Sequence, residues 1–78
     1  MRFKELDTVV LDRDIPEQGL RQGDLGAVVQ TYAPDGLEVE FVTASGHTQA
    51  IVTLRTSEVR PVGDRDLLSV RTVELGAA

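Results

Sequence analysis

Residues 26–42 contain the feature that most constrains the fold, an alternation of apolar and polar residues around a strong turn. In the stretch LEVEFV at residues 37–42 every second side chain is apolar, and the acids Glu38 and Glu40 lie between them. A period of two residues is typical of a β-strand with one buried face. The preceding run GAVVQTY is joined to this stretch by Ala33-Pro34-Asp35-Gly36, a turn sequence in which we expect Gly36 to accept a positive φ. Together they predict a β-hairpin.

Three further strands are predicted from runs that are rich in β-branched residues and separated by turn residues. They are residues 7–12 (DTVVLD), 47–54 (HTQAIVTL) and 59–62 (VRPV). Residues 15–22 are predicted to form a loop, because Pro16 disfavours helical geometry at the residue before it, and Leu20 in this loop should pack on the core. Residues 56–58 (TSE) are expected to form a 3₁₀ turn.

Five short strands with a long first loop predict an all-β fold, a small SH3-like five-stranded barrel over residues 1–62. Closing a small sheet removes most of its exposed edges. Residues 63–78 are predicted to be a C-terminal extension, either an extra strand or a mobile tail. Gly26 indicates a bulge or a close backbone approach. The predicted core comprises apolar residues of the strands and of the first loop: Val9, Leu11, Leu20, Val28, Val39, Phe41, Val52, Leu54 and Val59.

Three stretches of the chain, LDTVVLDRDIPEQGL, GDLGAVV and VRPV, carry a resemblance to a known family. With them, residues 3–62 resemble the small bacterial proteins known as domain of unknown function 4926. Members of that family look like stand-alone domains of this length, and the resemblance implies no established activity. Gly23, Gly26 and Val28 give a weaker similarity to the SH3-like domains of ribosomal and transcription-elongation proteins. The extension from Gly63 onward lies outside the resemblance.

Size, cysteine content and charge limit the class of protein. Seventy-eight residues make one small domain, and the absence of cysteine excludes disulfides and thiolate metal sites. We expect a cytoplasmic protein without a membrane segment, because no apolar run exceeds three residues. The net charge of −5 lies entirely in residues 1–42, which hold nine acids and four bases, while residues 43–78 hold four of each. This bias favours an acidic surface that attracts a basic partner.

The sequence contains no constellation typical of an enzyme. Its single histidine, His47, is expected in an exposed turn, and no serine lies in a Gly-x-Ser-x-Gly motif. Asp12, Asp14 and Glu17 lack the spacing of a calcium-binding loop, and Pro16 interrupts them. No glycine-rich phosphate loop precedes a helix. We therefore predict no catalytic, cofactor-binding or metal-binding residues.

Protein binding is the function that remains, because small acidic bacterial proteins include antitoxins and immunity proteins that block basic nucleases. We predict a non-catalytic module that inhibits a basic protein partner. Its contact residues are predicted on the acidic loop and on the central hairpin: Asp12, Asp14, Glu17, Tyr32, Glu38 and Glu40.

The two other possible partners are a second copy of the chain and a nucleic acid. One hypothesis is a homodimer in which two copies exchange the C-terminal tail. The alternative function is a nucleic-acid-binding SH3-like module that uses the four arginines of the second half: Arg55, Arg60, Arg65 and Arg71. Nucleic acid is the less favoured partner, because the chain is acidic and has only three aromatic residues.

Overall fold

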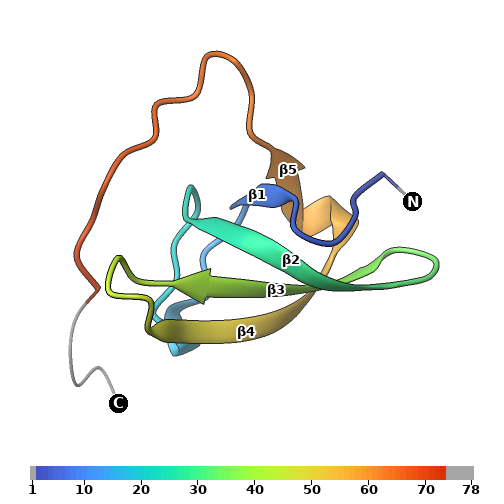
Figure 1. The fold of residues 1–78 in the computed structure, drawn as a ribbon, viewed down its shortest axis with the longest axis horizontal. Coiled ribbons are helices and arrows are strands. Elements are labelled where there is room, and N and C mark those ends of the chain that lie inside the picture. The colour runs from blue at the N-terminus through green and yellow to red at the C-terminus, as the bar shows by residue number, and fades with distance from the viewer. Residues whose placement is uncertain (1, 74–78) are drawn as a thin grey trace.

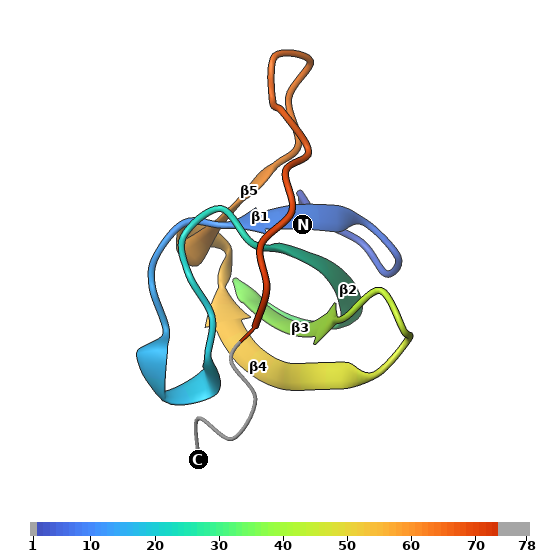
Figure 2. The same cartoon turned by 90° about the vertical axis from the view of Figure 1, so that its left-hand side faces the viewer.

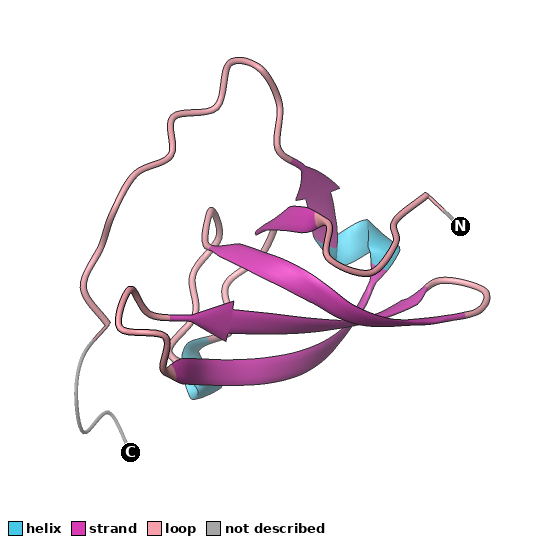
Figure 3. Ribbon diagram, in the orientation of Figure 1, coloured by secondary structure: helices cyan, strands magenta, loops and turns pink. Residues whose placement is uncertain are grey.

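The computed structural model describes residues 2–73 of the chain, which contain five β-strands and no α-helix. The strands are β1 (Thr8–Leu11), β2 (Leu25–Tyr32), β3 (Gly36–Val42), β4 (Thr48–Arg55) and β5 (Val59–Pro61) (Figure 1). Two 3₁₀ turns, η1 (Pro16–Gln18) and η2 (Thr56–Glu58), are drawn as helices in Figure 3. All five predicted strands are confirmed to within one residue at each end, and the 3₁₀ turn at residues 56–58 is confirmed. No helix in residues 2–73 is long and apolar enough to cross a membrane.

The strands form one antiparallel sheet in the order β4-β3-β2-β1-β5, and this sheet curves around the core (Figure 2). The sheet is not closed into a barrel, which corrects the prediction of a closed SH3-like barrel. The reason is topological. The strands β1 and β3 run in the same direction, because both are antiparallel to β2. Since β5 is antiparallel to β1 and β4 is antiparallel to β3, β4 and β5 also run in the same direction as each other. A parallel pair needs a connection of about a dozen residues or more, whereas the chain between β4 and β5 is the three-residue turn η2.

One cluster of apolar side chains forms the core on the concave side of the sheet. Eight of the nine predicted core residues are buried, and the ninth, Val52, is partly buried and packs against the cluster. Leu20 is among the buried residues, so the prediction that the first loop folds back onto the core is confirmed. The other buried members of the cluster were not predicted: Phe3, Ile15, Leu37 and Ala50.

Two glycines in the central hairpin are required by close packing. A Cβ on Gly26 would lie 2.6 Å from Cγ1 of Val39 and 2.8 Å from Cε2 of Phe41, so the predicted close backbone approach is confirmed. The prediction of a positive φ at Gly36 is wrong, because this residue opens β3 and pairs directly with Tyr32 in the extended ladder. A Cβ on Gly36 would lie 3.1 Å from the Tyr32 Cβ, so the glycine is explained by its neighbour rather than by its φ.

Replacing Gly26 by alanine tests the close approach. We expect Gly26→Ala to lower the free energy of unfolding by about 1–3 kcal/mol, because the added methyl group would displace two core side chains. Urea denaturation measures this. The control is Gly63→Ala, where the new Cβ would lie 3.4 Å from Asp66 Oδ2 in an exposed turn, and it should change the stability by less than about 0.5 kcal/mol. Equal stabilities of the two variants would contradict the prediction.

Candidate functional site

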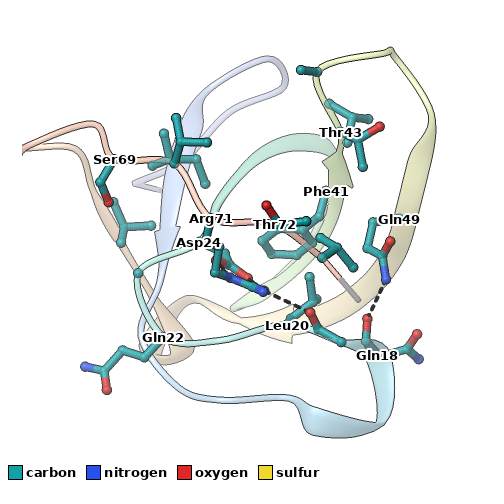
Figure 4. A pocket seen from close by; sticks show the side chains of 18 of the residues that line it. Gln18, Leu20, Gln22, Asp24, Phe41, Thr43, Gln49, Ser69, Arg71 and Thr72 are labelled. Carbon is teal, nitrogen blue, oxygen red and sulfur yellow. Dashed lines mark hydrogen bonds and ion pairs between the residues drawn. The ribbon is translucent and has the colours of Figure 1, made fainter. Parts of the chain in front are cut away.

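An open groove of about 1200 Å³ lies at the end of the sheet where β2 begins and β3 ends (Figure 4). Its strand wall includes the apolar side chains of Leu25 and Val42. A second wall is formed by residues 16–20 and 22–24 of the β1–β2 loop, and a third by residues 66–73. We call residues 63–73 the C-terminal segment; it leaves β5 and returns across the molecule to the groove (Figures 1 and 2).

The β1–β2 loop is held in one conformation by its own backbone bonds and by two core residues. Ile15 and Leu20 are buried, and each donates its amide hydrogen to the carbonyl of the other, at 3.0 and 3.1 Å. At the end of the loop the Arg21 amide donates to Oδ2 of Asp24 at 2.8 Å. The Leu11 amide donates to the Asp24 carbonyl, also at 2.8 Å. These bonds fix the Asp24 carboxylate at the rim of the groove.

Arg71 of the C-terminal segment is bound to this rim through three contacts. Its Nε donates to Oδ1 of Asp24 at 2.8 Å and its Nη2 donates to Oδ2 at 2.6 Å. Nη2 also donates to the carbonyl of Gly19 at 2.8 Å. Figure 4 shows the guanidinium beside Asp24. The side chains of Arg71 and Asp24 are only 29% and 18% exposed, so this bidentate pair is stronger than an ordinary surface ion pair.

A second arginine–carboxylate pair holds the other end of the C-terminal segment. Arg60 on β5 donates to both carboxylate oxygens of Asp66, at 2.8 and 3.0 Å, and the Gly63 amide donates to Oδ2 at 2.6 Å. Between the two pairs the apolar side chains of the segment remain in solvent. Their exposed fractions are 93% for Leu67, 69% for Leu68 and 96% for Val70.

No residue of 63–73 belongs to a strand. The predicted division into a domain of residues 1–62 and an extension of residues 63–78 stays a prediction. Residues 74–78 of the extension lie outside the described residues.

The two pairs lower the pKa values of their carboxyl groups. For Asp66, the hydrogen bonds from Arg60 and from the Gly63 amide lower the pKa from 3.8 to about 2. For Asp24, burial alone would raise the pKa, but the bonds from Arg71 and from the Arg21 amide outweigh it, so the pKa is lowered. Both carboxylates are therefore charged at neutral pH, which keeps the C-terminal segment attached at both ends.

Two of the three predicted contact residues of the acidic loop, Asp12 and Asp14, bind the same residue, Gln22. Oδ1 of Asp14 accepts the Gln22 amide at 2.8 Å, and Oδ1 of Asp12 accepts the Gln22 side chain at 3.3 Å. Two of the carboxylates thus help to hold the loop. Glu17 is exposed on η1 and lines the groove.

The other predicted contact residues lie together on the convex side of the hairpin, which we call the outer face. The Tyr32 hydroxyl donates to Oε1 of Glu38 at 2.9 Å, and this bond raises the pKa of the tyrosine. Thr48 Oγ1 donates to Oε2 of Glu40 at 2.6 Å. Ile51, directly across from Glu40, is 54% exposed and Val42 is 56% exposed. The outer face therefore combines two carboxylates with apolar side chains.

The outer face and the groove are continuous. A shallow hollow of about 170 Å³ on the outer face is lined by Glu40, Leu25 and Val42, among others. Leu25 and Val42 also line the groove. The predicted contact residues therefore form two groups, with Leu25 and Val42 between Glu40 and the loop.

Two of the four arginines proposed for nucleic-acid binding are paired with carboxylates. Arg60 binds Asp66 and Arg71 binds Asp24, so their charges are neutralised locally and are not available as a free stripe for phosphates. His47 is exposed in the turn before β4, as predicted. Within residues 2–73, no group of three or more histidine or carboxylate side chains is arranged to hold a metal ion.

The fold and the groove define a small all-β domain with an open five-stranded antiparallel sheet. The chain belongs to the family described as Domain of unknown function (DUF4926), which matches residues 5–61 and confirms the resemblance. No curated protein and no solved structure matches the chain. The family match ends at Pro61, the last residue of β5, so the C-terminal segment with Arg71 lies outside it.

Sequence reasoning missed Asp24 as a site residue, and it named Arg71 only for the nucleic-acid alternative, not as the partner of Asp24. Asp24 follows Gly23 and is readily explained as a turn residue, and its backbone bond to Arg21 has that role. The partner Arg71 is 47 positions away in a stretch without a clear period. No local pattern pairs two residues at such a separation.

Acid titration tests the Asp24–Arg71 pair. A carboxyl group whose pKa is lower in the folded than in the unfolded state stabilises the fold above the unfolded pKa of 3.8, and this stability is lost as the pH falls through the folded value. Asp24→Asn should lower the free energy of unfolding at pH 7 by about 1–2 kcal/mol. It should also flatten the loss of stability as the pH falls below the unfolded pKa of 3.8, measured by urea denaturation. The same exchange at the exposed Asp64 should change the stability at pH 7 by less than about 0.5 kcal/mol. Equal curves for Asp24→Asn and wild type would contradict the assignment.

Proposed function

We propose that this protein is a non-catalytic binding module whose outer face contacts a basic protein partner. The observation that supports this most directly is the state of Glu38 and Glu40. Both carboxylates accept a hydrogen bond from a hydroxyl group, and neither is in an ion pair with another of the residues 2–73. Their negative charges therefore remain available to lysine or arginine side chains of another protein.

The apolar residues on the same face support a protein as the partner. Ile51 and Val42 are more than half exposed and adjoin Glu40 across the sheet and along β3. Protein interfaces combine an apolar centre with polar groups at its rim, and tyrosine is enriched in them. Tyr32 at the end of β2 has its hydroxyl held by Glu38. This combination suits a contact in which carboxylates steer a basic surface onto an apolar patch.

The partner relation that we propose is inhibition of the antitoxin or immunity type, in which this domain covers a basic functional surface. The strand order, the long first loop and the 3₁₀ turn before β5 support the further proposal that the scaffold is an open relative of SH3-like domains. The nucleic-acid alternative has less support, because Arg60 and Arg71 are already paired with carboxylates.

Charge reversal on the outer face tests the proposal. The wild-type chain is immobilised and used to retain proteins from a lysate of the source cells, and a retained basic protein is then purified and titrated against each variant. Glu38→Lys and Glu40→Lys should each weaken its binding by about tenfold, since like charges oppose at the contact. The wild-type affinity should fall as salt is raised.

The matched control is Asp64→Lys, which makes the same change of charge at an exposed acid of the C-terminal segment. It should bind like the wild type. Circular dichroism checks that each variant is folded. A partner that binds Glu38→Lys and Glu40→Lys as tightly as the wild type would contradict the proposed face, and so would a retained protein that is acidic.

A further inference from the structure

The rim of the groove is built as a receptor for a guanidinium group. The Asp24 carboxylate and the Gly19 carbonyl together accept three hydrogen bonds from one arginine side chain. A planar fork that meets a carboxylate through two parallel bonds is the geometry that distinguishes arginine from lysine. The acceptors belong to the β1–β2 loop, which is fixed by the buried Ile15 and Leu20 independently of the C-terminal segment. The two acceptors are therefore held by contacts that do not involve Arg71.

The present occupant, Arg71, belongs to a segment that gains little else from being there. Leu67 and Val70 lie almost wholly in solvent, Leu68 is 69% exposed and Val73 is partly buried. No residue of 63–73 adds a strand to the sheet. At the groove end, the hydrogen bonds between the segment and the loop are those of the Arg71 side chain. Because one side chain holds this end of the segment, a competitor that presents the same group can displace it from the groove, while the Arg60–Asp66 pair keeps the other end attached.

We propose that Asp24 and the Gly19 carbonyl form an arginine-binding site that Arg71 fills in the free chain, and that an arginine on an extended segment of the basic partner replaces Arg71 there. This inference rests on the proposed function for the basic partner, and it adds that an arginine side chain of the partner is the group that binds. Leu25 and Val42 line the path between this site and Glu40. A partner on the outer face can therefore reach the site along a continuous apolar strip.

In the free chain, the C-terminal segment competes with an external ligand for the arginine site. The apparent affinity for an external ligand is reduced by the fraction of molecules in which the site is free. Because the segment is tethered, it competes at a high effective concentration. Removal of the Arg71 side chain should therefore strengthen the binding of an external arginine peptide.

A labelled peptide with the sequence of residues 66–73, DLLSVRTV, is the probe, and the receptor is the full chain. Fluorescence anisotropy should show that Arg71→Ala binds this peptide at least about tenfold more tightly than the wild type does. The control Arg65→Ala removes an exposed arginine of the same segment and should bind like the wild type. The peptides DLLSVATV and DLLSVKTV should bind Arg71→Ala at least about tenfold more weakly than DLLSVRTV.

A double variant, Asp24→Asn with Arg71→Ala, tests the acceptor. The asparagine oxygen can still accept the Arg21 amide, so the loop retains that bond while the negative charge is lost. Binding of DLLSVRTV should fall by at least about tenfold relative to Arg71→Ala, and circular dichroism confirms folding. Equal binding by the two receptors, or equal binding of the arginine and alanine peptides, would overturn the arginine site.

Two further measurements distinguish the arginine site from exchange of the tail between two copies and from binding at the outer face. Light scattering should give a monomer for the wild type; a dimer that dissociates in Arg71→Ala would overturn the arrangement within one chain in favour of exchange between two copies. Glu38→Lys in the Arg71→Ala background should leave peptide binding unchanged, because Glu38 is not part of the groove lining. The peptide measurements therefore test the arginine site, and the measurements with the purified partner test the outer face.

Discussion

The fold depends on the close approach between the backbone of β2 at Gly26 and the side chains of Val39 and Phe41. A single sheet without a second layer must bend over its own core, and a Cβ at this position would occupy the space of those two side chains. Register shifts occur shortly after, between Val28 and Gln30 and between Phe41 and Val42, and such irregularities increase the local bend and twist of strands. The curved sheet then encloses twelve apolar side chains in one cluster.

The same core determines where polar groups are presented. Ile15 and Leu20 anchor the β1–β2 loop, and this anchoring holds Asp24 at the rim of the groove with its carboxylate directed to Arg71. Three of the apolar side chains of the C-terminal segment, Leu67, Leu68 and Val70, are largely exposed, so its position depends mainly on ion pairs and hydrogen bonds. Segments with few buried contacts have low local stability. The rigid loop and the weakly held segment therefore provide a fixed site and an exchangeable occupant.

The period of two residues located the strands correctly because each strand has one face in the core and one in solvent. In LEVEFV the alternation alone distinguishes the buried Val39 and Phe41 from Glu38 and Glu40, without information from any other element. Barrel closure was predicted wrongly because it depends on the relative direction of β4 and β5, which becomes apparent only when all pairings are known. Gly36 was misassigned because a turn sequence does not reveal the neighbouring Tyr32 side chain.

By itself the sequence determined the strand positions, most of the core, the family and the acidic side chains of the central hairpin. These are local properties, set by side-chain polarity and turn chemistry over a few neighbouring residues. Only the tertiary structure decided that the sheet stays open and that Arg71 meets Asp24. Contacts between residues 47 positions apart arise from the path of the whole chain, and no short stretch of sequence specifies that path.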